Sequence, residues 1–308
     1  LLLIFQLFGI FKNNMKIKLL CFFITLFLFY ACKEKESENI PTEFNYIYSS
    51  SVSQIILDEN VNRKFWVRIP KKTTKNKYPI VMFFHGNGDE AFNFYQRSSE
   101  IKDLIDDGEF IGIFPNGHLR SWNCGNENSK ANDVEFVNMI IDFLKSNTQP
   151  ADLMDYDKIY GIGISNGGLI VNKIAKETSL FRAIAPIVSQ QSDVIGKTIS
   201  KRSLSVFQIN GTNDDLIPVE GGNSPVGHVF LSAKNSAENW AVNSKCDLNN
   251  LVEKSSIWGD FKVSSFSYIN CENSHVVSYH LVDGAGHQSN YGLGDLIYNR
   301  IWNFLKEY

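Results

Sequence analysis

A glycine-rich turn between a strand pattern and a helical pattern is the feature that most constrains how this chain can fold. Residues 158–162 are typical of a buried strand, and residues 166–176 have helical spacing. Between them, Gly163, Ser165 and Gly167 form the pattern Gly-x-Ser-x-Gly. Glycines suit these positions because the chain turns sharply and neighbouring backbone lies close. The turn therefore predicts a serine on a strained bend, with its hydroxyl exposed at the edge of a sheet.

A dinucleotide-binding turn is the main alternative for such a segment. That fingerprint, Gly-x-Gly-x-x-Gly placed on Gly161 and Gly163, requires a third glycine at position 166. Position 166 is Asn, so the sequence disfavours a nucleotide site. The formal net charge of −3 gives no basic surface for nucleic acid, and we expect no nucleic-acid partner.

Strand and helix patterns alternate along the rest of the chain. Predicted strands cover residues 65–69, 79–84, 110–114, 158–162, 183–188, 205–209 and 276–281. Predicted helices cover about 92–105, 134–144, 166–176 and 293–305, with Asn132 placed to cap the second. This alternation predicts an α/β fold, a mostly parallel central sheet with helices on both faces. Residues 65–69 are expected to form an antiparallel edge strand. Composition shows no break after residue 43, so we expect one catalytic domain over residues 44–308.

An activated serine needs a base and an acid that orients the base. Strand–turn–helix sites of this kind take them in the chain order serine, acid, histidine. Asp214 and Asp215 both follow a buried strand, where an acid lies at the same sheet edge as the serine. His287 follows the last predicted strand and is approached through a glycine-rich loop. These positions predict Ser165 as nucleophile and His287 as base, with either aspartate as the acid.

Negative charge that develops on a substrate carbonyl needs preformed hydrogen-bond donors. One is expected to be the backbone N–H of Asn166, directly after the serine at the start of a helix. The second is expected in the loop that begins with His85-Gly86, where we assign the N–H of Asn87. Chemistry of this kind requires no cofactor. The histidine spacing predicts no metal site.

The first 43 residues have the order of an export signal. Met15 opens a short positive segment, an apolar run follows, and a small residue precedes Cys32. This order predicts a lipoprotein signal peptide over 15–31 and a lipidated Cys32 with a polar tether over 32–43, residues 1–14 lying upstream of the natural start. An uncleaved membrane anchor is the alternative, which interrupting lysines disfavour. The expected product is an exported lipoprotein, periplasmic or on the cell surface, anchored in the membrane through Cys32.

Over roughly residues 60–308, the chain resembles secreted feruloyl and acetyl xylan esterases and the related polyhydroxybutyrate depolymerase-like esterases. The motifs that carry the resemblance are His85-Gly86, Trp122-Asn123 with Asp133-Val134, Gly211-Thr212-Asn213-Asp214 with Pro218 and Gly221-Gly222, Trp240-Ala241 with Asn243 and Cys246, Cys271, and Gly284-x-Gly286-His287. The resemblance implies the α/β-hydrolase fold and selects Asp214 over Asp215 as the acid. It also implies a disulfide between Cys246 and Cys271, whereas the sequence alone leaves their pairing with Cys124 open.

The resemblance further implies a serine carboxylic-ester hydrolase that acts on plant polysaccharide esters, such as feruloylated or acetylated xylan. Two departures leave the substrate open. Asn87 stands where these enzymes often have Cys, and Gln288-Ser289 follows the base where they often have Pro or Trp. One alternative is a polyhydroxyalkanoate or short-chain ester hydrolase with the same triad. Another, of a different class, is a non-catalytic surface lipoprotein that binds glycans.

Overall fold

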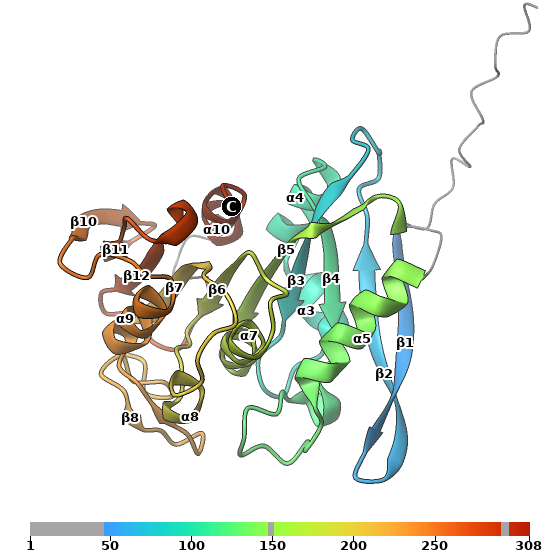
Figure 1. Cartoon of the computed structure of the whole chain (residues 1–308), viewed down its shortest axis with the longest axis horizontal. Coiled ribbons are helices and arrows are strands. Elements are labelled where there is room, and N and C mark those ends of the chain that lie inside the picture. Colours follow the sequence, from blue (N-terminus) through green and yellow to red (C-terminus); the bar gives the residue numbers. More distant parts are fainter. Residues whose placement is uncertain (1–45, 147–150, 291–295) are drawn as a thin grey trace, which may run out of the picture. The chain divides into compact units, whose positions relative to one another are not determined.

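The computed structural model describes residues 46–146, 151–290 and 296–308 (Figure 1). The expected leader, Cys32 and the tether to residue 43 lie outside these ranges, as do residues 1–14. Among the helices of the described ranges, none combines the length and the apolar character that crossing a bilayer requires. Asn45–Tyr308 form one compact unit.

A ten-stranded sheet, with the order β1-β2-β4-β3-β5-β6-β7-β12-β11-β10, forms the centre of this unit. Its strands are β1 Ile47–Ile56, β2 Glu59–Arg68, β3 Tyr78–Phe84, β4 Ile111–Pro115, β5 Met154–Ile164, β6 Ala183–Ile187, β7 Ser205–Gly211, β10 Leu251–Trp258, β11 Phe261–Tyr268 and β12 Val277–Val282. From β4 through β12 all neighbouring strands are parallel, and the outer strands at both edges pair antiparallel. The prediction of a mostly parallel sheet is confirmed.

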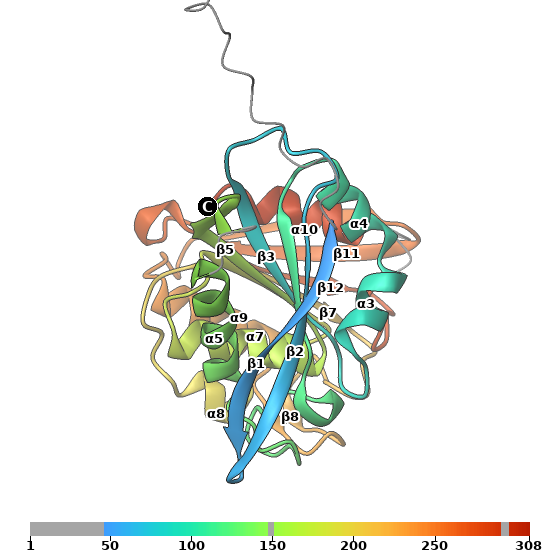
Figure 2. The same ribbon diagram turned by 90° about the vertical axis from the view of Figure 1, so that its right-hand side faces the viewer.

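Helices cover both faces of the sheet. They are α3 Ala91–Arg97, α4 Ser99–Asp106, α5 Asp133–Ser146, α7 Asn166–Glu177, α8 Asp193–Gly196, α9 Ala233–Asn243 and α10 Ile297–Leu305. Figure 2 shows α5, α7 and α9 on one side of the sheet and α3 and α4 on the other, where α10 packs against α4. The expected cap of α5 is present, because the Glu135 N–H donates to Asn132 Oδ1 at 3.1 Å.

The central strands β3, β4 and β6 are apolar along their length because both of their faces are buried. Phe83 on β3 illustrates this packing: its side chain has no exposed surface, and its ring stacks on that of Phe114 with centroids 4.9 Å apart. Tyr298 of α10 meets the same ring edge-on at 6.3 Å. The core on this side of the sheet therefore packs β3 and β4 against the C-terminal helix α10.

Two predictions about secondary structure are wrong. Residues 65–69 are not an edge strand, because β2 lies between β4 and β1, and β1 forms the edge. The helix expected over 92–105 is two helices, since Ser98 leaves helical geometry with φ −102° and ψ 78°. The Ser98 hydroxyl donates to the Phe94 carbonyl at 2.8 Å and thereby completes the end of α3.

The predicted disulfide between Cys246 and Cys271 is confirmed. The disulfide links Cys246, which follows α9, to Cys271, which follows the β10–β11 hairpin. Cys271 precedes β12, whereas His287 follows the other end of that strand. Cys124 is buried and carries a free thiol.

Candidate active site

Ser165 lies at the sharp turn between β5 and α7. Its φ of 55° and ψ of −120° are unusual for a residue with a side chain, and they turn its hydroxyl away from the helix. The positions of Gly163 and Gly167 on either side of Ser165 leave no room for a side chain. A Cβ on Gly163 would lie 2.1 Å from the Gly167 carbonyl oxygen, and one on Gly167 would lie 2.2 Å from that of Phe84. The strained bend predicted from the sequence is present.

His287 reaches the serine from the loop after β12. Its Nε2 lies 2.9 Å from Ser165 Oγ, although the two residues are 122 positions apart. The loop is held against the end of β7 because the Asn213 N–H donates to the Ala285 carbonyl at 2.9 Å. Gly211 permits this approach, since a Cβ there would lie 2.3 Å from the same carbonyl oxygen.

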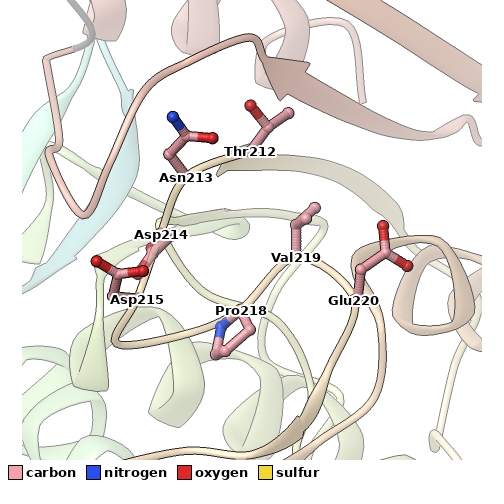
Figure 3. Close-up of a pocket in the computed structure, with 7 residues that line it drawn as sticks. All are labelled: Thr212, Asn213, Asp214, Asp215, Pro218, Val219 and Glu220. Carbon is pink, nitrogen blue, oxygen red and sulfur yellow. The ribbon is translucent and has the colours of Figure 1, made fainter.

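Asp214 completes the arrangement. Its Oδ2 lies 2.7 Å from His287 Nδ1, and its side chain has no exposed surface. Its Oδ1 accepts hydrogen bonds from the N–H groups of Leu216 and Ile217 at 2.9 and 2.8 Å. The carboxylate is therefore fixed by its own loop, with one oxygen left for the imidazole. Asp215, the rival aspartate, is exposed on the same loop (Figure 3).

The two expected oxyanion donors line one small pocket together with Ser165. The N–H of Asn166 is at the first position of α7, where a helix offers it no acceptor. In the other loop, the N–H of Gly88 donates to the Arg120 carbonyl at 2.7 Å. Among the backbone hydrogen bonds of the described residues, none uses the N–H of Asn87. The geometry leaves both N–H groups free to meet a substrate oxygen, and their role stays a prediction.

His85 stabilises the loop that contains Asn87 through three hydrogen bonds. It is fully buried, and burial lowers its pKa despite a hydrogen bond to the Gly86 carbonyl that acts in the opposite direction. Its Nε2 accepts from the Gly117 N–H at 3.0 Å, and its carbonyl accepts from Trp122 Nε1 at 2.9 Å. A neutral imidazole with Nδ1 protonated satisfies all of these contacts, so His85 acts as a structural residue.

The sequence analysis missed two residues at this site, Glu127 and His228. Both line the pocket beside Ser165, and Glu127 Oε1 lies 2.8 Å from His228 Nε2. They are 101 positions apart in loops without a recognisable motif, so no sequence pattern relates them. Elsewhere in the described ranges, no group of three or more His, Cys, Asp or Glu side chains is placed to hold a metal ion.

Comparison with known proteins gives partial matches. No family model matches the chain. Over 170 residues it is 26% identical to the bifunctional acetylxylan esterase/xylanase XynS20E of Neocallimastix patriciarum, an alignment that covers 52% of this chain and 22% of that protein. Its structure is similar to the acetyl xylan esterase from Aspergillus awamori, with a TM-score of 0.56 and 14% identity over 84% of this chain and 99% of that one. A ferulic acid esterase is similar with a TM-score of 0.52 and 14% identity, over 85% and 98% of the two chains.

The sequence match and the structural matches support different conclusions. The chain spans about a fifth of the length of the curated relative named above. The solved structures share too little sequence to show more than the fold. The fold and the sequence match agree with each other and with the expected resemblance. The chain has the α/β-hydrolase fold, and about half of its sequence is similar to an acetylxylan esterase/xylanase.

Proposed function

We propose that this protein is a serine carboxylic-ester hydrolase that works through an acyl-enzyme. The observation that carries the proposal is a continuous chain of hydrogen bonds from Asp214 through His287 to Ser165, here called the relay. Asp214 Oδ2 lies 2.7 Å from His287 Nδ1, and His287 Nε2 lies 2.9 Å from Ser165 Oγ. Both distances are those of hydrogen bonds, and the three groups follow the order acid, base and nucleophile.

The reaction follows from this order. Ser165 Oγ attacks the ester carbonyl while His287 Nε2 accepts its proton, and Asp214 stabilises the charged imidazole. The tetrahedral oxyanion is held by the N–H groups of Asn87 and Asn166, each worth on the order of 3 kcal/mol of barrier. His287 then protonates the leaving alcohol as the C–O bond breaks. Water activated by the same imidazole hydrolyses the acyl-enzyme and releases the carboxylic acid.

We propose plant polysaccharide esters, acetylated or feruloylated xylan, as the substrate class. The support is the names of the relatives, which include acetyl xylan and ferulic acid esterases.

The test compares wild type with Ser165→Ala on 4-nitrophenyl acetate, methyl ferulate and defined acetylated or feruloylated xylan fragments. Ser49→Ala, an exposed serine on β1, is the matched control. We expect Ser165→Ala to abolish hydrolysis and Ser49→Ala to leave it unchanged. A folded wild type that hydrolyses none of these esters would overturn the proposal and favour a glycan-binding role.

We also propose that the protein is an exported lipoprotein anchored through Cys32. The support is the sequence order of a positive segment, an apolar run and a small residue before the cysteine. Cells grown with an alkyne-bearing fatty acid are expected to label wild type but not Cys32→Ser. Equal labelling of both proteins would contradict the anchor.

A further inference from the structure

The pocket beside Ser165 lies on the acyl side of the proposed reaction. It is lined by Ser165 and by the two proposed oxyanion residues, Asn87 and Asn166. His287, which must reach the leaving alcohol, does not belong to the described residues that line it. A carbonyl held by the two N–H groups therefore directs its acyl group into this pocket.

The pocket is small and mostly apolar on one side. Its volume is about 100 Å³, and its apolar lining consists of Leu169, Ile217, Val226 and Phe230. Pockets that enclose a drug-sized molecule occupy roughly 300 to 1,000 Å³. This small volume favours short acyl groups, such as acetyl or butyryl, over a bulky feruloyl group.

A hydrogen-bonded pair of side chains, Glu127 and His228, forms the polar wall of the pocket. Glu127 Oε1 lies 2.8 Å from His228 Nε2, and the two side chains are 13% and 7% exposed. His228 belongs to the short hairpin that ends in β9, Val229–Phe230, whereas Glu127 belongs to the loop before α5. A second contact ties the same segments, because Asn126 Nδ2 donates to the Gly227 carbonyl at 2.6 Å.

Glu127 is fixed from several sides. Its Oε2 accepts from the Cys124 N–H at 2.7 Å, and its Oε1 also accepts from Asn166 Nδ2 at 3.0 Å. Burial on its own would raise the pKa of Glu127, but the hydrogen bond and charge of His228 and the backbone N–H groups lower it below its usual value. The carboxylate is thus ionised at neutral pH. A substrate cannot displace it without breaking a largely buried network.

We infer that the Glu127–His228 pair is a wall that limits the acyl group of an ester substrate to short chains. The inference rests on the proposed function and adds to it the residues that set acyl size. A long acyl chain would have to separate two loops that the pair and its neighbouring hydrogen bonds hold together. Short acyl groups fit without any such change.

The experiment uses 4-nitrophenyl esters of two, four, six and eight carbon atoms. Wild-type kcat/KM is expected to fall at least tenfold between the four- and eight-carbon esters, because a methylene without space is worth roughly tenfold or more. His228→Ala opens the wall and should reduce this fall to less than about threefold. Val229→Ala, the exposed neighbour outside the pocket, should resemble wild type, whereas His228→Gln, which keeps size and a donor, should restore most of the fall that His228→Ala removes.

The outcomes separate the two proposals. Equal hydrolysis of two- and eight-carbon esters by wild type would overturn the size limit, and so would a His228→Ala series no different from that of Val229→Ala. Either result would leave the esterase proposal intact. If His228→Ala does not fold, His228→Val removes the same polar wall with a residue suited to a strand. Failure of wild type both to hydrolyse any ester and to react at Ser165 with an ethyl fluorophosphonate would overturn the proposed function itself.

Discussion

Trp122 and Asn166 are joined by two hydrogen bonds of opposite direction. The Trp122 N–H donates to Asn166 Oδ1 at 2.8 Å, and Asn166 Nδ2 donates to the Trp122 carbonyl at 3.0 Å. Asn166 directly follows Ser165 and begins α7, so this clamp fixes the loop at residue 122 against the proposed oxyanion donor. The side chain of Asn166 therefore positions the backbone N–H of the same residue.

Asn166→Ala is therefore expected to lower kcat about 10- to 100-fold with little change in KM. A misplaced N–H donor weakens binding of the oxyanion, which exists only in the transition state. Loss of both partners of Trp122 should also lower the free energy of unfolding by about 1 to 3 kcal/mol. Steady-state kinetics and urea unfolding measure the two effects. Asn138→Ala, on the exposed side of α5, is the control, and an Asn166→Ala enzyme with unchanged kcat would refute the positioning role.

Asp214 and Asp215 provide a matched pair of substitutions. Asp214→Asn should lower kcat by about 10³- to 10⁴-fold, because an amide cannot hold the imidazole in the required tautomer. Asp215→Asn should change kcat by less than about threefold, since its carboxylate is exposed and Asp214 alone contacts His287. Initial rates on 4-nitrophenyl acetate distinguish the two. A larger loss of kcat from Asp215→Asn than from Asp214→Asn would show that Asp215, and not Asp214, is the acid.

The parallel sheet and the turn at Ser165 could be predicted from local sequence patterns, whereas the choice of Asp214 over Asp215 depended on the resemblance to known esterases. Buried parallel strands such as β3 are continuously apolar, and the glycines around Ser165 report a turn that admits no side chain. The edge strand β1 was missed because four of its ten residues are exposed and it contains Ser49-Ser50-Ser51, without an apolar alternation. Glu127 and His228 were missed for a different reason. Their pairing depends on how two loops meet, and no local pattern encodes that.

Removal of the disulfide should affect stability and leave activity intact. The bridge closes a separation of 25 residues, so Cys246→Ala with Cys271→Ala should lower the free energy of unfolding by about 3 to 4 kcal/mol. The site should be unaffected because β12 separates the bridge from the His287 loop by about 20 Å. Urea unfolding with and without reductant measures the effect, and reductant should have no influence on the double variant. Loss of esterase activity in a folded double variant would contradict this separation.

Lys176 should make stability depend on pH in the alkaline range. It lies fully buried on α7, where Nζ donates to Asn239 Oδ1 at 2.6 Å and sits 4.3 Å from the Trp240 ring centroid. Burial lowers the pKa of Lys176 from its usual 10.5 to about 8. Between these values the unfolded chain binds more protons than the folded one, so the free energy of unfolding rises with pH in that window. Below pH 8 the full penalty for burying the charge is present.

Lys176→Met removes this penalty with a side chain of similar length, and Asn239 Oδ1 keeps a second donor in Asn243. The variant should therefore gain stability relative to wild type at pH 7.5, and this relative gain should shrink by about 1 to 2 kcal/mol at pH 9.5. Urea unfolding of both proteins at the two pH values measures the difference. Lys234→Met, on the exposed side of α9, should show no such change. A pH-independent difference between Lys176→Met and wild type would mean that the amine is protonated throughout, held by Asn239 and the Trp240 ring.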